Sequence, residues 1–186
     1  LIEPSSTDST GATLAEQRAF RSALLELSEL SYSNDDDADF YETLLARAVS
    51  VVPGAQAGSI LVHRPGTDEY HFVAAEGFDL AALQENCLHE STMFRSTDNP
   101  EATINHNVAE KSQATEHAEW LATAGRIRDI VVNVSAPVFI GGAPVAFISL
   151  DNFDDPDAFS TTSVEMTTVI GRLIADLLRR RELEAE

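Results

Sequence analysis

The sequence predicts an α+β domain in which helices cover an antiparallel sheet. Two pairs of short β-rich segments are each joined by a turn signal, and apolar residues recur every three or four positions near both ends of the chain. With 186 residues and a hydrophobic fraction of 44%, the chain can bury one core but not two comfortable ones. We therefore expect a single domain over residues 13–186, preceded by a disordered polar tail at residues 1–12.

Two amphipathic helices are expected first. Residues 13–30 place Phe20 and several leucines three, four or six positions apart, with Arg, Glu and Ser between them. Residues 37–52 carry a second apolar stripe, which Pro53 and Gly54 end. The stripe of residues 37–52 is expected to pack in the core.

The first hairpin is expected after these helices. Residues 58–64 and 69–76 are β-rich and are joined by Pro65-Gly66-Thr67-Asp68, whose Pro, Gly and Asp favour a turn. A brief helix is expected through Leu80 and Leu83.

The middle of the chain, residues 85–125, has the least regular pattern. Residues 89–100 predict a short helix that Ser91 caps. Residues 102–108 predict a short strand, and residues 113–125 predict a helix that ends at Gly125.

The last third predicts a second hairpin and a long helix. Apolar residues alternate over residues 130–138, Gly141-Gly142 suits a two-residue turn, and residues 143–150 return as a strand. Pro137 indicates an edge or a bulge. Apolar residues at helical spacing then run from Val164 to Leu178.

These segments together resemble a GAF domain, the small-molecule sensor module of signalling proteins. The resemblance covers about Asp37 to Arg180. It rests on "YETLLARAVSVVPGAQAGSILVHRPGTDEYHFVAAEGFD", "AGRIRDIVVNVSAPVFIGGAPVAFISLDN" and "FSTTSVEMTTVIGRLIADLL". It implies a GAF-like antiparallel sheet with flanking helices, in which the N- and C-terminal helices pack together.

The resemblance also implies a ligand pocket between the sheet and the variable middle segment. The residues that it would place there are Phe78, Ser91, Thr92, Phe94, Ile104, Trp120, Val132 and Val134. The expected helix start at Ser91-Thr92 would be the anchor for an anionic ligand. Cyclic-nucleotide-binding GAF domains often carry an Asn-Lys pair, a Phe and an Asp-Glu pair near the last strand. Only Asn152 and Phe159 match that pattern, so it predicts no nucleotide site.

No catalytic or metal-binding residue is expected, and the sequence names no cofactor. Cys87 lies two positions from His89 rather than adjacent to it, unlike the cysteine of bilin-binding GAF domains. A single cysteine also cannot complete the intramolecular disulfide cycle of GAF proteins that reduce methionine sulfoxide. His89, His106 and His117 lie on separate segments, so solvated or singly hydrogen-bonded side chains are expected rather than a metal centre.

The composition excludes some partners. The chain has 31 acidic against 12 basic residues and a formal net charge of −19, so we expect no direct contact with nucleic acid or with a membrane. Two explanations would account for Lys111 being the only lysine: a host that lives in molar salt, or GC-rich coding, which favours Arg over Lys. The carboxylate excess favours the halophilic host. The single cysteine excludes an intrachain disulfide and fits a reducing cytoplasm.

The expected function is that of a cytoplasmic, non-enzymatic sensory or regulatory domain, excised from a transcription regulator or a histidine kinase. It would bind a small ligand and relay the signal through its terminal helices. These helices would also form a homodimer, with Leu173 in the interface. Two alternatives remain: a ligand-free GAF module used only for dimerisation, and a redox enzyme built on a GAF fold.

Overall fold

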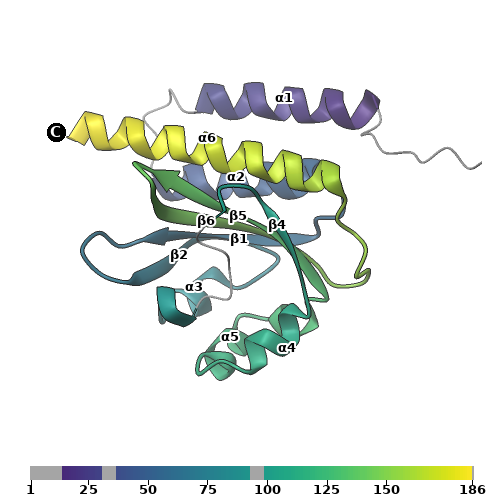
Figure 1. Cartoon of the computed structure of the whole chain (residues 1–186), viewed down its shortest axis with the longest axis vertical. Helices are drawn as coiled ribbons and strands as arrows, with labels where there is room; N and C mark the ends of the chain where they lie inside the picture. The colour runs from purple at the N-terminus through teal and green to yellow at the C-terminus, as the bar shows by residue number, and fades with distance from the viewer. Residues whose placement is uncertain (1–13, 31–36, 93–98, 186) are drawn as a thin grey trace, which may run out of the picture.

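The computed structural model describes residues 14–30, 37–92 and 99–185, which form a sheet covered by helices on both faces (Figure 1). Two long helices cover one face, with a third helix outside them, and short helices cover the other face. This is the predicted GAF-like α+β architecture, with the first and last helices on the same side of the sheet.

The described residues form six strands in the order β3-β2-β1-β6-β5-β4, and every neighbouring pair is antiparallel. The strands are β1 (Ala57–His63), β2 (Glu69–Glu76), β3 (Leu88–His89), β4 (Thr103–His106), β5 (Val132–Ile140) and β6 (Ala143–Asn152). Because β6 returns beside β1, segments that lie far apart in the sequence form the centre of the sheet.

The helices form two groups. They are α1 (Leu14–Leu30), α2 (Asp37–Val51), α3 (Leu80–Leu83), α4 (Val108–Gln113), α5 (Ala118–Thr123) and α6 (Thr161–Ala185), with the 3-10 turns η1 (Glu90–Thr92) and η2 (Arg126–Asp129). α2 and α6 pack on one face of the sheet, and α1 packs against α2. None of the described helices combines the length and the apolar character needed to cross a bilayer.

The main core lies between α2, α6 and the central strands. In α6 the buried side chains Met166, Ile170, Ile174 and Leu177 recur at helical spacing and so form one stripe. Opposite them the sheet presents Ile60, Val132, Val134, Ala136, Ile148 and Leu150. Complete burial of each such large aliphatic side chain contributes ~1.5–3 kcal/mol, so this interface supplies much of the stabilisation of the fold.

Both predicted hairpins are confirmed. Gly141 and Gly142 have φ values of 60° and 86°, the left-handed region that both central residues of a type I′ turn require. β5 pairs with β4 only over residues 132–135, so among the described strands β5 has one free side at Pro137. Pro137 therefore occupies the edge position that its missing N–H group allows.

The middle of the chain differs from the sequence-based prediction. Residues 102–108 were predicted as one strand, but β4 ends at His106 because Asn107 adopts the left-handed conformation (φ 59°) and α4 begins directly after it. The helix predicted over residues 113–125 is shorter, since α5 spans only Ala118–Thr123.

Asn152 is only 5% exposed, and its side chain fixes the end of β6 through three hydrogen bonds. Its Nδ2 donates to the Gly54 carbonyl at 2.7 Å, and its Oδ1 accepts from the N–H groups of Asp154 and Asp155 at 2.9 and 2.8 Å. Gly54 has a φ of 91°, and a Cβ on it would overlap the Ala158 carbonyl oxygen. The loop after α2 and the exit of β6 are therefore held together at a position that only glycine suits.

Asn152→Ala is expected to lower the free energy of unfolding by about 2–4 kcal/mol, because it removes three hydrogen bonds at a buried site. Urea unfolding followed by circular dichroism measures the loss. Asn99→Ala is the matched control: Asn99 is exposed and accepts one hydrogen bond, from the Glu101 N–H, so its loss should stay below about 1 kcal/mol. Equal losses in both variants would contradict the role assigned to Asn152.

Candidate functional site

A cavity of about 60 Å³ lies between the sheet and its cover of short helices, on the face opposite α2 and α6. Strands β1, β2, β5 and β6 contribute to one side of it, and α3, α4, α5 and η2 contribute to the other. One water molecule needs roughly 10–15 Å³ of such space, so the cavity has room for roughly four to six.

Most of the wall is apolar. It is formed by Phe72, Phe78, Leu83, Leu88, Val108, Leu121, Ile127 and Ile130. Six of these side chains are buried members of a second hydrophobic cluster, and Phe78 and Leu88 pack against it. The cluster also contains Leu61, Tyr70 and Phe147 from the sheet. The cover of short helices is thus held to the sheet by its own core.

The polar part of the wall has two sources. Ser59, Asn133 and Asp151 come from the strands, and Ser112, Thr115 and His117 come from α4 and the loop that leads to α5. Hydroxyl, amide, carboxyl and imidazole groups therefore meet inside a mostly apolar enclosure. This combination is typical of small-molecule sites.

A hydrogen-bonded network orders the sheet side of the site. Asn105 Nδ2 donates to Asn133 Oδ1 at 2.9 Å and to the Ser135 hydroxyl at 3.1 Å. Asn133 Nδ2 in turn donates to the Ser149 hydroxyl at 3.3 Å. Three strands thereby fix the orientation of the Asn133 amide at the cavity wall.

Asp151 brings a carboxyl group to the cavity and is only 3% exposed. It lies directly opposite Asn133 in the β5–β6 register. A carboxyl group at such a depth favours a ligand that donates hydrogen bonds or carries positive charge.

His117 carries a buried polar atom without a hydrogen-bond partner. The residue is 9% exposed, and among the described residues its Nε2 has no donor or acceptor within hydrogen-bond distance. The nearest carboxylate atom, Glu116 Oε1, lies 3.6 Å away, which is too far for a hydrogen bond. The ring is held edge-on to Trp120 at 5.6 Å and stacks on His89 at 6.5 Å. Because His117 lines the cavity, a polar ligand there could supply the missing partner.

The structure brings only part of the predicted pocket together. Phe78 lines the cavity. Trp120 lies behind the wall, where its Nε1 donates to the Ala82 carbonyl at 2.8 Å and so ties α5 to α3.

Ile104, Val132 and Val134 were placed on the wrong face of the sheet. Val132 and Val134 are fully buried in the main core under α2 and α6, and Ile104 packs against that same core. Side chains alternate along a strand, so Asn133, between the two valines, faces the cavity instead.

The predicted anion anchor lies in a 3-10 turn as far as the described residues extend. Ser91 and Thr92 belong to η1, a three-residue 3-10 turn, and Ser91 is exposed and outside the cavity wall. Phe94, also predicted to line the pocket, lies outside the described residues.

The sequence-based prediction of the pocket included none of the polar wall residues. Asn133, Ser149 and Asp151 each interrupt an apolar strand at alternate positions, and that interruption is the signal that could have identified them. No comparable signal marks Ser112 or His117, because the helix predicted over residues 113–125 does not show that α4 and the residues before α5 face the sheet.

Comparisons with models of protein families and with curated proteins found no match. Solved structures are similar in fold. The GAF domain of a phosphoenolpyruvate-protein phosphotransferase from Coxiella burnetii matches with a TM-score of 0.72 at 12% identity, over 90% of this chain and 97% of that one. The GAF domain of a protein described as a sensor histidine kinase from Pseudomonas syringae pv. tomato matches with a TM-score of 0.59 at 16% identity, over 92% of this chain and 90% of that one.

The chromophore-binding domain of a Stigmatella aurantiaca phytochrome is also similar. It gives a TM-score of 0.63 at 15% identity, over 95% of this chain and 64% of that one. The chain therefore has the fold of GAF domains.

His117→Phe is expected to raise the free energy of unfolding of the ligand-free chain by about 1–2 kcal/mol, because it removes a buried polar atom that has no partner and keeps a ring of similar size. Urea unfolding of the wild type and the variant measures the gain. His63→Phe is the control, since His63 Nε2 lies 2.7 Å from the Thr67 carbonyl and its loss should bring no gain. A His117→Phe variant that is clearly less stable than the wild type would refute this account of Nε2.

Proposed function

We propose that the chain is a sensory or regulatory domain that binds a small polar ligand in the cavity between its sheet and its short helices. The observation that carries this proposal is the buried Nε2 of His117, which lacks a partner among the described residues and belongs to the wall of a partly open cavity. Structural neighbours from a sensor kinase and a phytochrome support the regulatory role.

The wall chemistry restricts the class of ligand. Among the described residues, no arginine or lysine lines the cavity, whereas Asp151 does. An anion would therefore be buried without a counter-charge, at a large cost in free energy. We infer a neutral or cationic ligand that donates hydrogen bonds to Asp151 and Asn133.

The size of the cavity implies movement of its cover. A ligand that is to be enclosed there and is larger than roughly four to six water molecules would require α3, α4 and α5 to shift away from the sheet. The ligand would then shift the equilibrium toward the conformation in which the cover is displaced. The size of this shift is set by how much more tightly the ligand binds that conformation.

The same strands connect the cavity to the helices of the other face. Asn133 contacts the cavity, while its neighbours Val132 and Val134 pack in the core that contains α6. A ligand that shifts β5 or β6 would therefore alter the packing of α6, and this is the proposed route to an effector. A cytoplasmic location, which fits the single thiol, is part of the proposal.

We propose a non-enzymatic role. Activation of a serine or threonine hydroxyl requires a hydrogen bond from that hydroxyl to a base. His117 Nε2 makes none, although Ser112 and Thr115 line the same cavity.

We also propose a homodimer through the terminal helices. Leu14 and Leu25 of α1 are 63% and 69% exposed, and a spacing of eleven residues places them on one side of the helix. Leu173 is less suitable than the sequence indicated, because it packs against the core of its own chain. A dimerisation module without a ligand remains the second candidate, and the exposed leucines alone favour it.

A ligand from a panel of small neutral and cationic metabolites is expected to raise the melting temperature. At about 100 times its dissociation constant it adds ~2.7 kcal/mol, or roughly 5–10 °C for a chain of this size. Ser112→Val fills part of the cavity and should abolish this rise.

Ser50→Val, at an exposed position of α2, is the matched control and should keep the rise. A rise of equal size in Ser112→Val would exclude the cavity as the binding site. Unchanged melting across the whole panel would favour the dimerisation module.

Leu25→Glu is expected to shift the chain from dimer to monomer, because it places a charge within the proposed apolar contact. Multi-angle light scattering at several protein concentrations measures the mass. Glu42→Gln, on the exposed side of α2, is the control and should remain dimeric. A wild-type chain that is monomeric at all concentrations would refute the dimer.

A further inference from the structure

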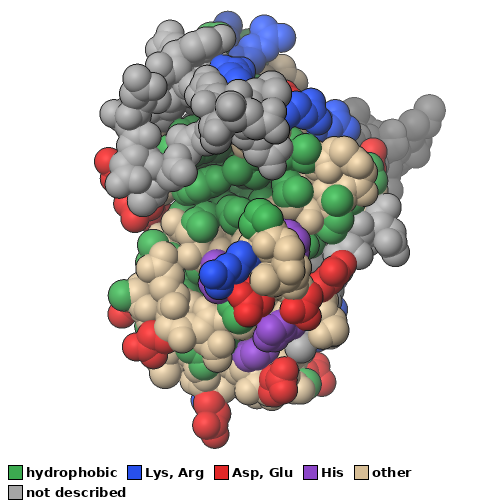
Figure 2. All heavy atoms as spheres, turned by 90° about the vertical axis from the view of Figure 1, so that its left-hand side faces the viewer, with side chains coloured by type: hydrophobic (Ala, Val, Ile, Leu, Met, Phe, Trp, Pro, Cys, Tyr) green, Lys and Arg blue, Asp and Glu red, His purple; other side chains and the backbone are tan. Residues whose placement is uncertain are grey.

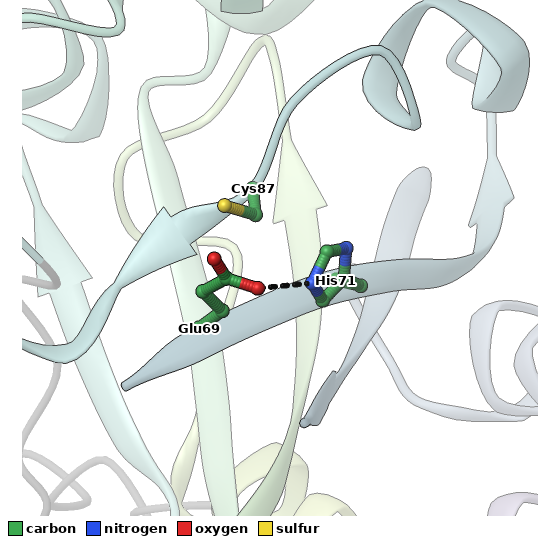
Figure 3. Close-up of side chains that lie close together, drawn as sticks. All are labelled: Glu69, His71 and Cys87. Atoms are coloured by element: carbon green, nitrogen blue, oxygen red, sulfur yellow. Dashed lines mark hydrogen bonds and ion pairs between the residues drawn. The ribbon is translucent and has the colours of Figure 1, made fainter. Parts of the chain in front are cut away.

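We propose that Glu69, His71 and Cys87 bind a divalent transition-metal ion of the zinc class. One carboxylate oxygen, one imidazole nitrogen and the thiol sulfur of these residues all lie within 4.8 Å of one another. Glu69 Oε2 and His71 Nε2 are already 3.2 Å apart. Figure 3 shows the three side chains directed into the same space, two from β2 and one from the segment that leads into β3. Within the described part of the chain, this is the one such group of potential ligands.

The strand register accounts for the convergence. Glu69 and His71 are two positions apart on β2 and so lie on the same side of the strand. β3 pairs antiparallel with β2, Glu69 opposite His89 and Tyr70 opposite Leu88. The next position in this register sets Cys87 opposite His71. The cluster is thus assembled by a hairpin-like pairing that sequence spacing alone does not reveal.

The ligand types and their distances fit zinc. Cysteine, histidine and carboxylate are its usual ligands, with bonds of roughly 2.0–2.3 Å, so the ligand atoms of a tetrahedral site lie about 3.3–3.8 Å apart. The pair Glu69–His71 is close to that separation already. Cys87 must approach by about 1.5 Å at most, and all three residues are only partly buried, so their side chains can adjust. Water would complete the fourth position.

The surroundings are anionic. Burial and the charges of Glu69 and Asp68 raise the pKa of the Cys87 thiol, while Arg64 opposes this shift. Arg64 Nη1 lies 3.5 Å from Glu69 Oε2 but is 65% exposed, so an incoming cation can displace it. Figure 2 looks onto this end of the sheet and shows histidine side chains gathered beside acidic ones.

Metal binding exchanges a proton for the ion. The sulfur–hydrogen bond of Cys87 breaks, the proton passes to the buffer, and the thiolate donates an electron pair to the metal; no oxidation state changes. Affinity should therefore increase with pH while the thiol is protonated.

The ion would fix the position of β3. This strand has two residues, of which Leu88 lines the cavity and His89 stacks on His117. A bond from the metal to Cys87, the residue before Leu88, ties that wall to β2. The inference concerns a separate site and stands whether or not the cavity binds a ligand.

The test is a titration of the reduced, metal-free full chain with Co²⁺ in a thiol-free buffer. We expect a thiolate-to-cobalt charge-transfer band that saturates at one ion per chain and disappears on addition of Zn²⁺. Cys87→Ser should remove the band. His71→Ala and Glu69→Gln should each keep it but weaken Co²⁺ binding by ~10-fold or more.

His63→Ala is the matched control, because His63 lies on the adjacent strand β1 outside the cluster and should leave the titration unchanged. Circular dichroism checks that each variant is folded. Absence of the band in the wild type would overturn the proposal. Wild-type affinity in both His71→Ala and Glu69→Gln would overturn it too, since the thiol would then bind cobalt on its own.

Discussion

Side chains alternate between the two faces of the sheet along β5 and β6, and this alternation determines which groups each face presents. In their register Val134 lies opposite Leu150, and the next pair along, Asn133 with Asp151, projects to the other side. Apolar pairs thus meet α2 and α6, while polar pairs meet the cavity. A shift of one residue in the pairing would place the amide and the carboxyl group in the main core and the apolar chains at the cavity, so the hydrophobic pattern fixes the register strongly.

This division separates stability from binding. The face covered by α2 and α6 buries large aliphatic side chains, whereas on the cavity face polar groups interrupt a second, smaller apolar cluster and stabilise the fold little or not at all. Asn152 connects the loop after α2 with the start of β5. Its side chain donates a hydrogen bond to that loop, and its carbonyl oxygen accepts one from the N–H of Val131, just before β5. The network of Asn105, Asn133 and Ser149 is then positioned by a sheet whose stability comes from elsewhere.

The sequence predicts the elements with strong periodicity but not the arrangement of the short ones. Both hairpins and the long helices follow from patterns that extend over many residues, and the fold follows from them. The alternation in residues 130–138 shows which side chains share a face, but not which helices cover it; for this reason Val132 and Val134 were assigned to the pocket. The boundary at Asn107 depends on one left-handed residue, and the stacking of His117 on His89 depends on a segment far away in the chain.

The edge strand β3 connects the two proposed sites physically. Leu88 and the Cys87 that precedes it come from one short segment, which β2 holds through only two residue pairs. So short a pairing has little stability of its own, and its position depends on what binds at either end. If a metal and a cavity ligand each favour one position of β3, each must change the affinity of the other by the same factor. The short strand β3 is therefore where the two binding events can influence each other.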